Sequence, residues 1–508
     1  MLSFASVGYL YKQRNVVECT HEDVAGEWNM TWALRDLKAN GGIWAGVFIV
    51  LVVTQTLLCA MSVSMGVNSY YQGLSAKTRD PVKSLASALS LIFLTVIVLG
   101  CLVIKQTLQA SIRQRRQGLA LLSLLGATPK QILVLTLLQV MILVLPASLV
   151  AVALSPALAG RILDWYSAGM RIPVHFAFTW HGFPRSALTG LAVGLATAVL
   201  ATSRTLRDLG KMTPVRVVRR AEESESIDRP RHGRGLVSLF LGLALLLLPL
   251  PVFAYLSRNG SGSLEPKQVQ AVISAVGSGP LFAILLLLIA LARSGGPVIS
   301  RVTQLWTALV PSSSAVWRIA RSQAVARSRD TTFGSTVIAL TACMFLVGGL
   351  LAAGGTSTIA MNKVPGIENV TSGGTLELLY GFWAALLVAL VGVIAGFAIA
   401  ARDRDLDLAL LSIAGANPRQ LTAISILDGT IVMTTGIIIA AGGTGLVGLS
   451  TAMVYWPLIH SLSVIFPWQF FLICGLPIIV VGSLATMLTA RPALMRSPIA
   501  ILQGAIGE

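Results

Sequence analysis

Long apolar stretches constrain this chain more than any other feature of its sequence. A helix that crosses a bilayer needs about 20 mostly apolar residues, and ten stretches of the 508-residue chain reach or approach that length. We expect spanning helices at residues 43–64, 84–104, 132–154, 187–203, 236–256, 269–292, 333–354, 379–401, 421–446 and 469–490. Only 12% of the residues are charged, against about a quarter in soluble domains. The sequence therefore excludes an ordinary soluble enzyme and predicts an all-α integral membrane protein.

The distribution of positive charge predicts how these helices are oriented. Loops rich in Lys and Arg stay on the cytoplasmic side of a membrane. With the amino terminus inside, the inner segments hold 29 of the 38 Lys and Arg residues. Four tryptophans lie in or beside the expected outer loops: Trp165, Trp180, Trp456 and Trp468. We expect both termini in the cytoplasm and no secretory signal in the polar first thirty residues. The net charge of +17 is explained by these cytoplasmic segments, so we expect no nucleic-acid partner.

An internal repeat sets the organisation of the chain. The sequence LALLSLLGATPKQ at 119–131 and the sequence LALLSIAGANPRQ at 408–420 are identical at nine of thirteen positions, with an offset of 289 residues. Each copy precedes an apolar stretch and lies in the second inner loop of a four-helix unit. The segments that precede the two units are also weakly similar to each other: Trp32-Ala33-Leu34-Arg35 and Trp317-Arg318-Ile319-Ala320-Arg321. Because two connector helices separate the units, we expect two parallel four-helix repeats related by an axis along the membrane normal.

The repeat predicts seven segments. The two four-helix units are expected at 43–204 and 333–490. The other segments are an amino-terminal cytosolic or interfacial segment at 1–42, a cytosolic linker at 205–235, connector helices 5 and 6 at 236–292, a second cytosolic linker at 293–332 and a cytosolic tail at 491–508.

Each repeated loop is predicted to form a helical elbow. In the first copy the second spanning helix should extend into the cytoplasm, with three basic side chains in solvent: Arg113, Arg115 and Arg116. The apolar residues that follow are available for burial: Leu121, Leu122 and Leu125. Closing a helical hairpin is the simplest role for such a loop. Its duplication in near-identical form favours a docking surface for a soluble partner with two equivalent faces.

The second half of the motif predicts a tight corner between two helices. Gly126 suits a helix end that needs a positive φ angle. Thr128 or Asn417 suits the N-cap of the next helix, with Pro129 or Pro418 at its first position. We therefore expect a rigid elbow that returns the chain to the membrane.

These motifs resemble those of the FtsX-like permease family of ABC transporters. The resemblance is carried by the basic cluster, the L-A-L-L core and the G-A-x-P-K/R-Q sequence, with W-x-L-R one span earlier, and it covers both four-helix units. It implies the ten-span fused form of a permease subunit in the bacterial cytoplasmic membrane. It also implies a cytosolic ABC ATPase dimer that binds ATP and Mg²⁺ and docks on the repeated loops.

Two features depart from the family pattern. The family usually places Glu before the apolar core, where this chain has Gly118 and Asp407. The outer loops at 65–83 and 355–378 are short. We therefore expect no large substrate-gripping outer domain.

The resemblance implies that the elbow residues contact the ATPase. In the first copy these are Arg113, Arg115, Arg116, Leu121, Leu122, Gly126 and Pro129; in the second they are Arg402, Arg404, Asp407, Leu410, Leu411, Gly415 and Pro418. The first copy is purely basic and the second mixes both signs. We expect unequal contacts, so that charge reversal at Arg115 and Arg116 weakens ATPase association more than reversal at Arg402 and Arg404.

The chain contains no motif for catalysis or nucleotide binding. It has no GxxxxGK[ST] phosphate loop, no HExxH or GxSxG sequence, and scattered cysteines without metal-ligand spacing. We expect neither enzyme activity nor a cofactor or metal in this chain. Asp428 and Gln139, matched at the 289-residue offset, form an intramembrane polar pair that we interpret as hydrogen-bonding groups rather than a proton site.

Two GxxxG pairs are also present, Gly190 with Gly194 and Gly392 with Gly396. We interpret them as sites of close helix packing rather than gating.

The expected function is a permease subunit that couples ATP hydrolysis by a separate ATPase to export or extraction of an amphipathic substrate, either a peptide or a lipid-like molecule. The alternative is a non-transporting mechanotransmission subunit that regulates an extracytoplasmic partner protein. A secondary transporter driven by an ion gradient is a third possibility, which would need no ATPase.

Overall fold

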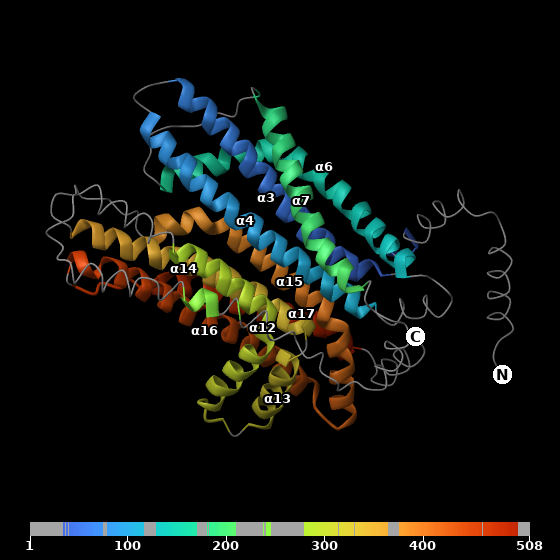
Figure 1. The fold of residues 1–508 in the computed structure, drawn as a ribbon. Helices are drawn as coiled ribbons and strands as arrows, with labels where there is room; N and C mark the ends of the chain where they lie inside the picture. The colour runs from blue at the N-terminus through green and yellow to red at the C-terminus, as the bar shows by residue number, and fades with distance from the viewer. Residues whose placement is uncertain are drawn as a thin grey trace, which may run out of the picture.

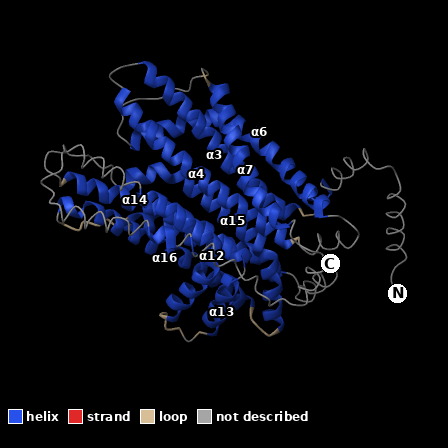
Figure 2. Cartoon of the chain, in the orientation of Figure 1, coloured by secondary structure: helices blue, strands red, loops and turns tan. Residues whose placement is uncertain are grey.

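The computed structural model is all-helical over the residues that it describes (Figure 1, Figure 2). The described residues are 34–35, 37–38, 40–74, 79–115, 129–169, 180, 182–209, 237, 240–244, 279–312, 314–329, 331–363, 375–459 and 461–495. Eight helices within these ranges are long and apolar enough to cross a bilayer. The chain is therefore a multi-pass membrane protein, as the sequence predicts.

These eight helices fall into two groups of four along the chain. The first group comprises α3 (Gly41–Leu74), α4 (Arg79–Gln114), α6 (Pro129–Gly169) and α7 (Phe183–Leu209). The second comprises α14 (Thr331–Asn362), α15 (Thr375–Ile413), α16 (Pro418–Ile459) and α17 (Trp468–Met495). They coincide with the first four and the last four of the ten expected spans.

The fifth and sixth expected spans are not among these eight helices. Residues 245–278, which include most of the fifth expected span and the start of the sixth, lie outside the described part of the chain. Helix α12 (Gly279–Ala308) contains more than half of the sixth expected span and continues into the segment expected to be a linker. It is followed by α13 (Ala315–Arg329), and both helices pack against α14 and α16.

Several helices are much longer than the bilayer requires. Helix α16 has 42 residues, which at about 1.5 Å per residue gives a length of about 63 Å. The hydrocarbon core is only about 30 Å thick. Helix α16 is therefore longer than a straight crossing of that layer requires, and it continues beyond residue 446, where the ninth expected span ends.

Helices α4 and α15 join the two groups (Figure 1). They pack against each other, and each also packs against the first helix of the opposite group, since α3 contacts α15 and α14 contacts α4. Gly392 of α15 lies so close to the Val103 side chain of α4 that a Cβ atom there would collide with it. One hydrophobic core continues through both groups.

The glycine pairs mark close helix approaches. A Cβ atom on Gly190 would lie 2.8 Å from the Cα atom of Cys59, so α7 crosses α3 at backbone distance. A Cβ atom on Gly194 would lie 3.5 Å from the side chain of Gln55, one turn further along the same crossing. The packing interpretation of the GxxxG sequence in α7 is therefore confirmed, because only a residue without a side chain fits at Gly190.

We predict that Gly190→Ala lowers the free energy of unfolding by about 1–3 kcal/mol, because overpacking forces α3 and α7 apart. Gly160→Ala is the matched control, since a Cβ atom there meets nothing within 4 Å. That control should be neutral or stabilising by up to about 1 kcal/mol, because alanine favours a helix. Thermal unfolding of both purified variants in detergent measures the difference, and equal midpoints would contradict the crossing.

Candidate docking site at the helical elbows

The second copy of the repeated motif forms a tight helical elbow between α15 and α16. Gly415 follows the end of α15 with φ of 92°, the left-handed region that glycine tolerates best. The amide of Gly415 donates to the Ser412 carbonyl at 3.0 Å, and the amide of Ala416 donates to the Leu411 carbonyl at 3.0 Å. This pair of bonds is a Schellman motif, which satisfies carbonyls at the end of a helix.

The start of α16 is capped by two reciprocal hydrogen bonds. The Oδ1 atom of Asn417 accepts from the Arg419 amide at 3.3 Å, and Oε1 of Gln420 accepts from the Asn417 amide at 3.0 Å. Pro418 occupies the first helical position, where its missing N–H costs nothing. The cap at Asn417 and the helix start at Pro418 are therefore confirmed. Gly415, the counterpart of Gly126 in the second copy, ends α15 with the positive φ angle expected of Gly126, which lies outside the described residues.

The elbow has its own small apolar cluster. Leu408, Leu421 and Ala490 are buried together, with Leu411 and Ala416 packed against them. This cluster ties the elbow to the last turns of α17, because Ala490 belongs to that helix. The corner is thus held by side-chain packing as well as by its caps.

Two large apolar side chains point away from that cluster. Leu410 is 50% exposed and Ile413 is 57% exposed, one helical turn apart on α15. Arg419 and Gln420 are exposed beside them on α16. We call Leu410, Ile413 and Arg419 the elbow face. Ile413 was not among the sequence candidates, although its spacing of three residues from Leu410 places both on one side of a helix.

The other candidates of the second copy are less accessible or not described. Leu411 and Asp407 are half-buried. Arg402 and Arg404 lie in α15, and their side chains are outside the described residues.

In the first copy only part of the elbow lies within the described chain. Residues 116–128 are outside it, and these contain Arg116, Leu121, Leu122 and Gly126. Arg113 and Pro129 lie in α4 and α6, with their side chains outside the described residues.

Arg115 is only partly exposed, which corrects the expectation that its side chain lies in solvent. Its Nη1 atom donates to Oε1 of Gln139 at 3.1 Å, and its guanidinium lies 5.2 Å from the ring centroid of Trp44. Burial lowers the pKa of Arg115 to about 10. The periodicity of α4 could not reveal this, because Trp44 and Gln139 come from α3 and α6. Arg115 therefore links three helices of the first group at the base of the elbow.

The neighbouring Gln114 reaches the second group. Its Nε2 atom donates to the backbone carbonyl of Ile399 in α15. The end of α4 is thus bonded to both groups of helices, directly before the first elbow.

The matched polar residues of the membrane interior are both buried. Gln139 of α6 is bonded to Arg115, so for this residue the hydrogen-bonding interpretation is confirmed. Asp428 of α16 is 1% exposed. They lie at corresponding positions of the two helices that follow the elbows.

These features define the protein as a multi-pass helical membrane protein with a capped elbow between two long helices. Residues 90–208 match a protein-family model described as FtsX-like permease C-terminal. This stretch contains most of α4, the first elbow, α6 and α7, and it is an FtsX-like permease domain of the ABC transporter permease family. Such domains are non-catalytic membrane subunits of ABC systems and pair with ABC ATPases. No curated protein matches the chain.

We predict that Gly415→Ala loosens the elbow, because a left-handed φ costs an alanine about 1–2 kcal/mol. Asn417→Ala should cost about 1 kcal/mol through loss of the N-cap. Hydrogen exchange of the peptide over residues 411–421 measures both effects. Gly442→Ala in α16 is the control, since its Cβ atom meets nothing within 4 Å. Unchanged exchange at the elbow in the first two variants would show that the caps do not hold it.

Proposed function

We propose that this chain is the permease subunit that couples ATP hydrolysis by a separate ABC ATPase to export or extraction of an amphipathic substrate. The observation that carries the proposal is the elbow face. Leu410 and Ile413 expose half or more of their surface on a corner that is fixed by two caps. Exposed apolar side chains on a rigid element are suited to a partner interface, where they become the buried anchors.

The pairing of the helices supports two equivalent halves. Helix α3 of the first group contacts α15 of the second, and α14 of the second group contacts α4 of the first. Helices α4 and α15 also contact each other. Val103 and Gly392 touch at the centre of this contact, and they are separated by 289 residues, the offset of the sequence repeat. An axis through that contact would exchange the two groups. One elbow for each subunit of an ATPase dimer follows from such symmetry.

The continuity of the helices supports mechanical coupling. Helix α16 runs without interruption from Pro418 at the elbow to Ile459 at its far end. Closure of the ATPase dimer would displace the elbow, and the long helix would carry that displacement across the bilayer. The proposed orientation, with elbows and termini in the cytoplasm, agrees with the excess of Lys and Arg in those segments.

The opposite end of the second group supports an amphipathic substrate. The chain between α16 and α17 packs inward at Ile465, whose side chain lies 3.4 Å from a Cβ atom placed on Gly355 and whose backbone oxygen lies 3.5 Å from one placed on Gly448. Its alternate residues are exposed and apolar: Leu462, Val464, Phe466 and Trp468. An apolar edge at the proposed outer surface suits a cargo that is partly embedded in the membrane.

The alternative, a transmitter that moves no cargo, is favoured by one observation. The contact of α4 with α15 is closely packed at Val103 and Gly392, so the halves meet through side chains there and not through an open path. Movement of the halves can then act on a partner protein outside without passing a substrate between them.

We predict that Leu410→Asp with Ile413→Asp reduces co-purification of the cognate ATPase by more than tenfold, since loss of an interface anchor costs about 2 kcal/mol or more. Arg419→Glu should reduce it less, because exposed charges contribute little. Leu462→Asp, equally exposed but at the opposite end of α16 and α17, is the control. Equal retention of ATPase by all variants would exclude the elbow face as the docking site.

Transport in reconstituted vesicles separates the two candidate functions. With permease and ATPase in the bilayer, we expect ATP-dependent release of a labelled amphipathic peptide or lipid from the membrane. The Leu410→Asp and Ile413→Asp variant should lose this activity while remaining folded. ATP hydrolysis without movement of any such cargo, together with nucleotide-dependent binding of an outer protein, would instead support the transmitter.

A further inference from the structure

Helices α12 and α13 form a hairpin that extends sideways from the second group (Figure 1). Arg321 of α13 donates from Nη2 to the backbone carbonyl of Gln304 in α12 at 3.3 Å, which holds the two helices together. Ala320 and Ala324 are buried, so one side of α13 is packed against the rest of the protein. We call residues 298–326 the lateral hairpin.

The lateral hairpin is bonded to a candidate membrane span of the bundle. The Nε1 atom of Trp306 donates to Oγ1 of Thr435 at 2.9 Å, and the hydroxyl of Thr303 lies 3.2 Å from the same oxygen. Thr435 is near the middle of the candidate span Pro418–Met453. An element attached at this level meets lipid before it meets a soluble protein.

The free side of α12 is unusually apolar for an exposed surface. Val298, Leu305 and Leu309 follow one another at helical spacing, and Leu305 and Leu309 are 71% and 83% exposed. Leu309 and Val310 lie just beyond the end of α12 at Ala308, and Val310 is 39% exposed. In water such a stripe would be costly, whereas in the acyl region of a leaflet it is favourable.

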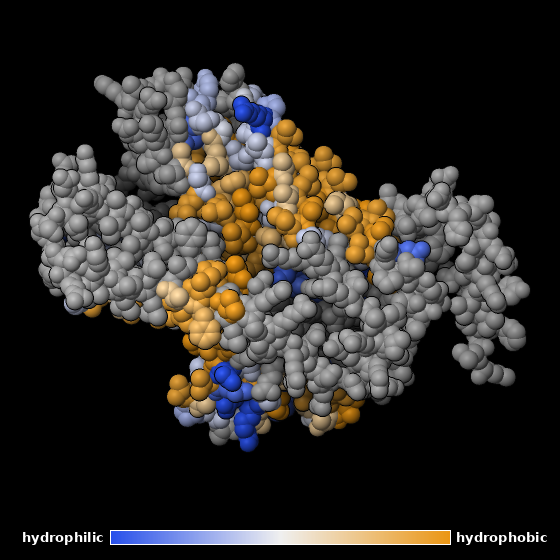
Figure 3. Space-filling view, viewed as in Figure 1, coloured by the Kyte–Doolittle hydropathy of each residue, from blue (hydrophilic) through white to orange (hydrophobic). Residues whose placement is uncertain are grey.

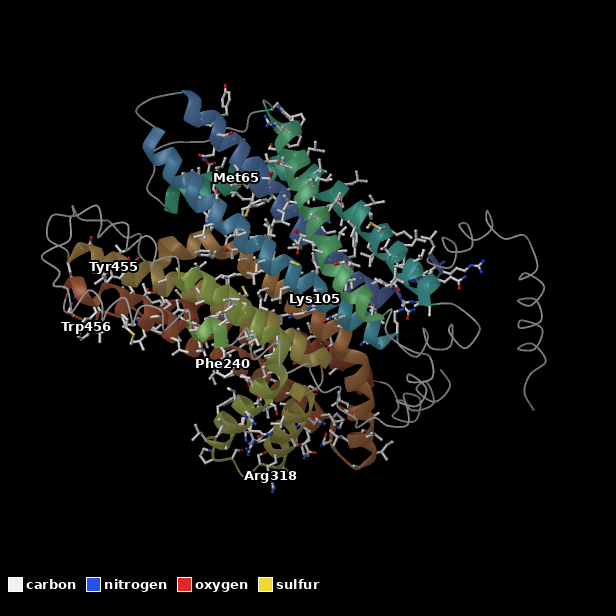
Figure 4. The ribbon with its side chains drawn as sticks, in the orientation of Figure 1. Met65, Lys105, Phe240, Arg318, Tyr455 and Trp456 are labelled. Carbon is white, nitrogen blue, oxygen red and sulfur yellow. The ribbon has the colours of Figure 1, made fainter. Side chains whose placement is uncertain are left out.

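Arginine side chains accompany this stripe without any acidic residue. Arg301 is exposed between Val298 and Leu305, and Arg318 is exposed on α13. Figure 4 shows Arg318 directed away from the bundle, and Figure 3 shows a hydrophilic patch beside apolar surface in the region of α12 and α13. Residues 279–329 contain six Arg and no Asp, Glu or Lys. Arginine has a long stem that lets its charge reach the headgroup level while the stem stays in apolar surroundings.

We propose that the lateral hairpin binds acidic phospholipid, with Leu305 and Leu309 in the acyl chains and Arg301 and Arg318 on the lipid phosphates. Arginine matches phosphate through two parallel N–H donors, and each basic residue at an anionic surface adds to the attraction. We assign this lipid to the cytosolic leaflet, and this assignment rests on the proposed orientation of the elbows. The preference for acidic lipid does not.

Bound lipid would act on the same half of the protein as the elbow face. The hairpin is bonded to Thr435 of α16, and α16 begins at the elbow. Acidic lipid would therefore act chiefly on the second elbow, because the main contacts of α12 and α13 with the bundle are to α14 and α16.

The test uses the full chain alone in vesicles that contain photoreactive phosphatidylglycerol or photoreactive phosphatidylcholine. We expect crosslinks within residues 298–326, with a clear excess for phosphatidylglycerol. Arg301→Gln and Arg318→Gln should each reduce the affinity for phosphatidylglycerol about fivefold and leave phosphatidylcholine unchanged. Leu305→Asn with Leu309→Asn should reduce crosslinking by both lipids. All four side chains are exposed, so these variants should keep the unfolding midpoint of the wild type.

The matched control is Arg185→Gln with Leu188→Asn, an exposed pair at the start of α7 in the other half. It should leave crosslinking at the hairpin unchanged. Equal labelling by the two lipids in the wild-type chain would overturn the proposal without using any variant. A second result would also overturn the proposal: added ATPase protects residues 298–326 from crosslinking, and the arginine variants lose ATPase binding. The hairpin would then be a protein interface. No ATPase is needed for the lipid measurement, so its failure would leave the proposed coupling function intact.

Discussion

The contact between α4 and α15 is the constraint on which the rest of the structure depends. Glycine at position 392 admits the Val103 side chain, and the two helices come close enough to bring the first helix of each group against the opposite half. Dispersion forces need such proximity, because lipid offers no hydrophobic drive to hold helices together. At the end of α4, Gln114 and Arg115 add polar bonds to both halves. The halves therefore form one continuous core rather than two bundles side by side.

Around this contact the two halves are built differently. In the first, α7 crosses α3 at backbone distance through Gly190. In the second, α17 packs chiefly on α15 and α16, and α12 covers part of α14. Close approaches there involve α14 and α16, where Gly443 meets Phe345 and Gly436 meets Thr341. The two copies of the repeated motif thus adjoin units of unequal internal packing, and among the described residues the lateral hairpin packs chiefly on the second unit.

Features with local causes could be predicted from the sequence. The spans follow from apolar length, and the corner at Gly415 and Asn417 follows from backbone rules that need no tertiary information. The environment of Arg115 could not be predicted, because it depends on Trp44 and Gln139 from other helices. The exposure of Ile413 also depends on which side of α15 the Leu408 cluster covers. The continuation of α12 beyond residue 292 was missed because hydropathy marks where a helix leaves the apolar layer and not where its hydrogen bonding ends.

The length of α16 has a consequence for the size of the motion that a motor must supply. A stiff rod of about 63 Å that rotates by about 5° moves its far tip by about 5 Å relative to its base. The packing of Gly436 and Gly443 against α14 means that two rods would swing together. A modest angular change at one surface of the bilayer thus becomes a displacement comparable to a helix pitch at the other, with no need for any helix to bend or melt.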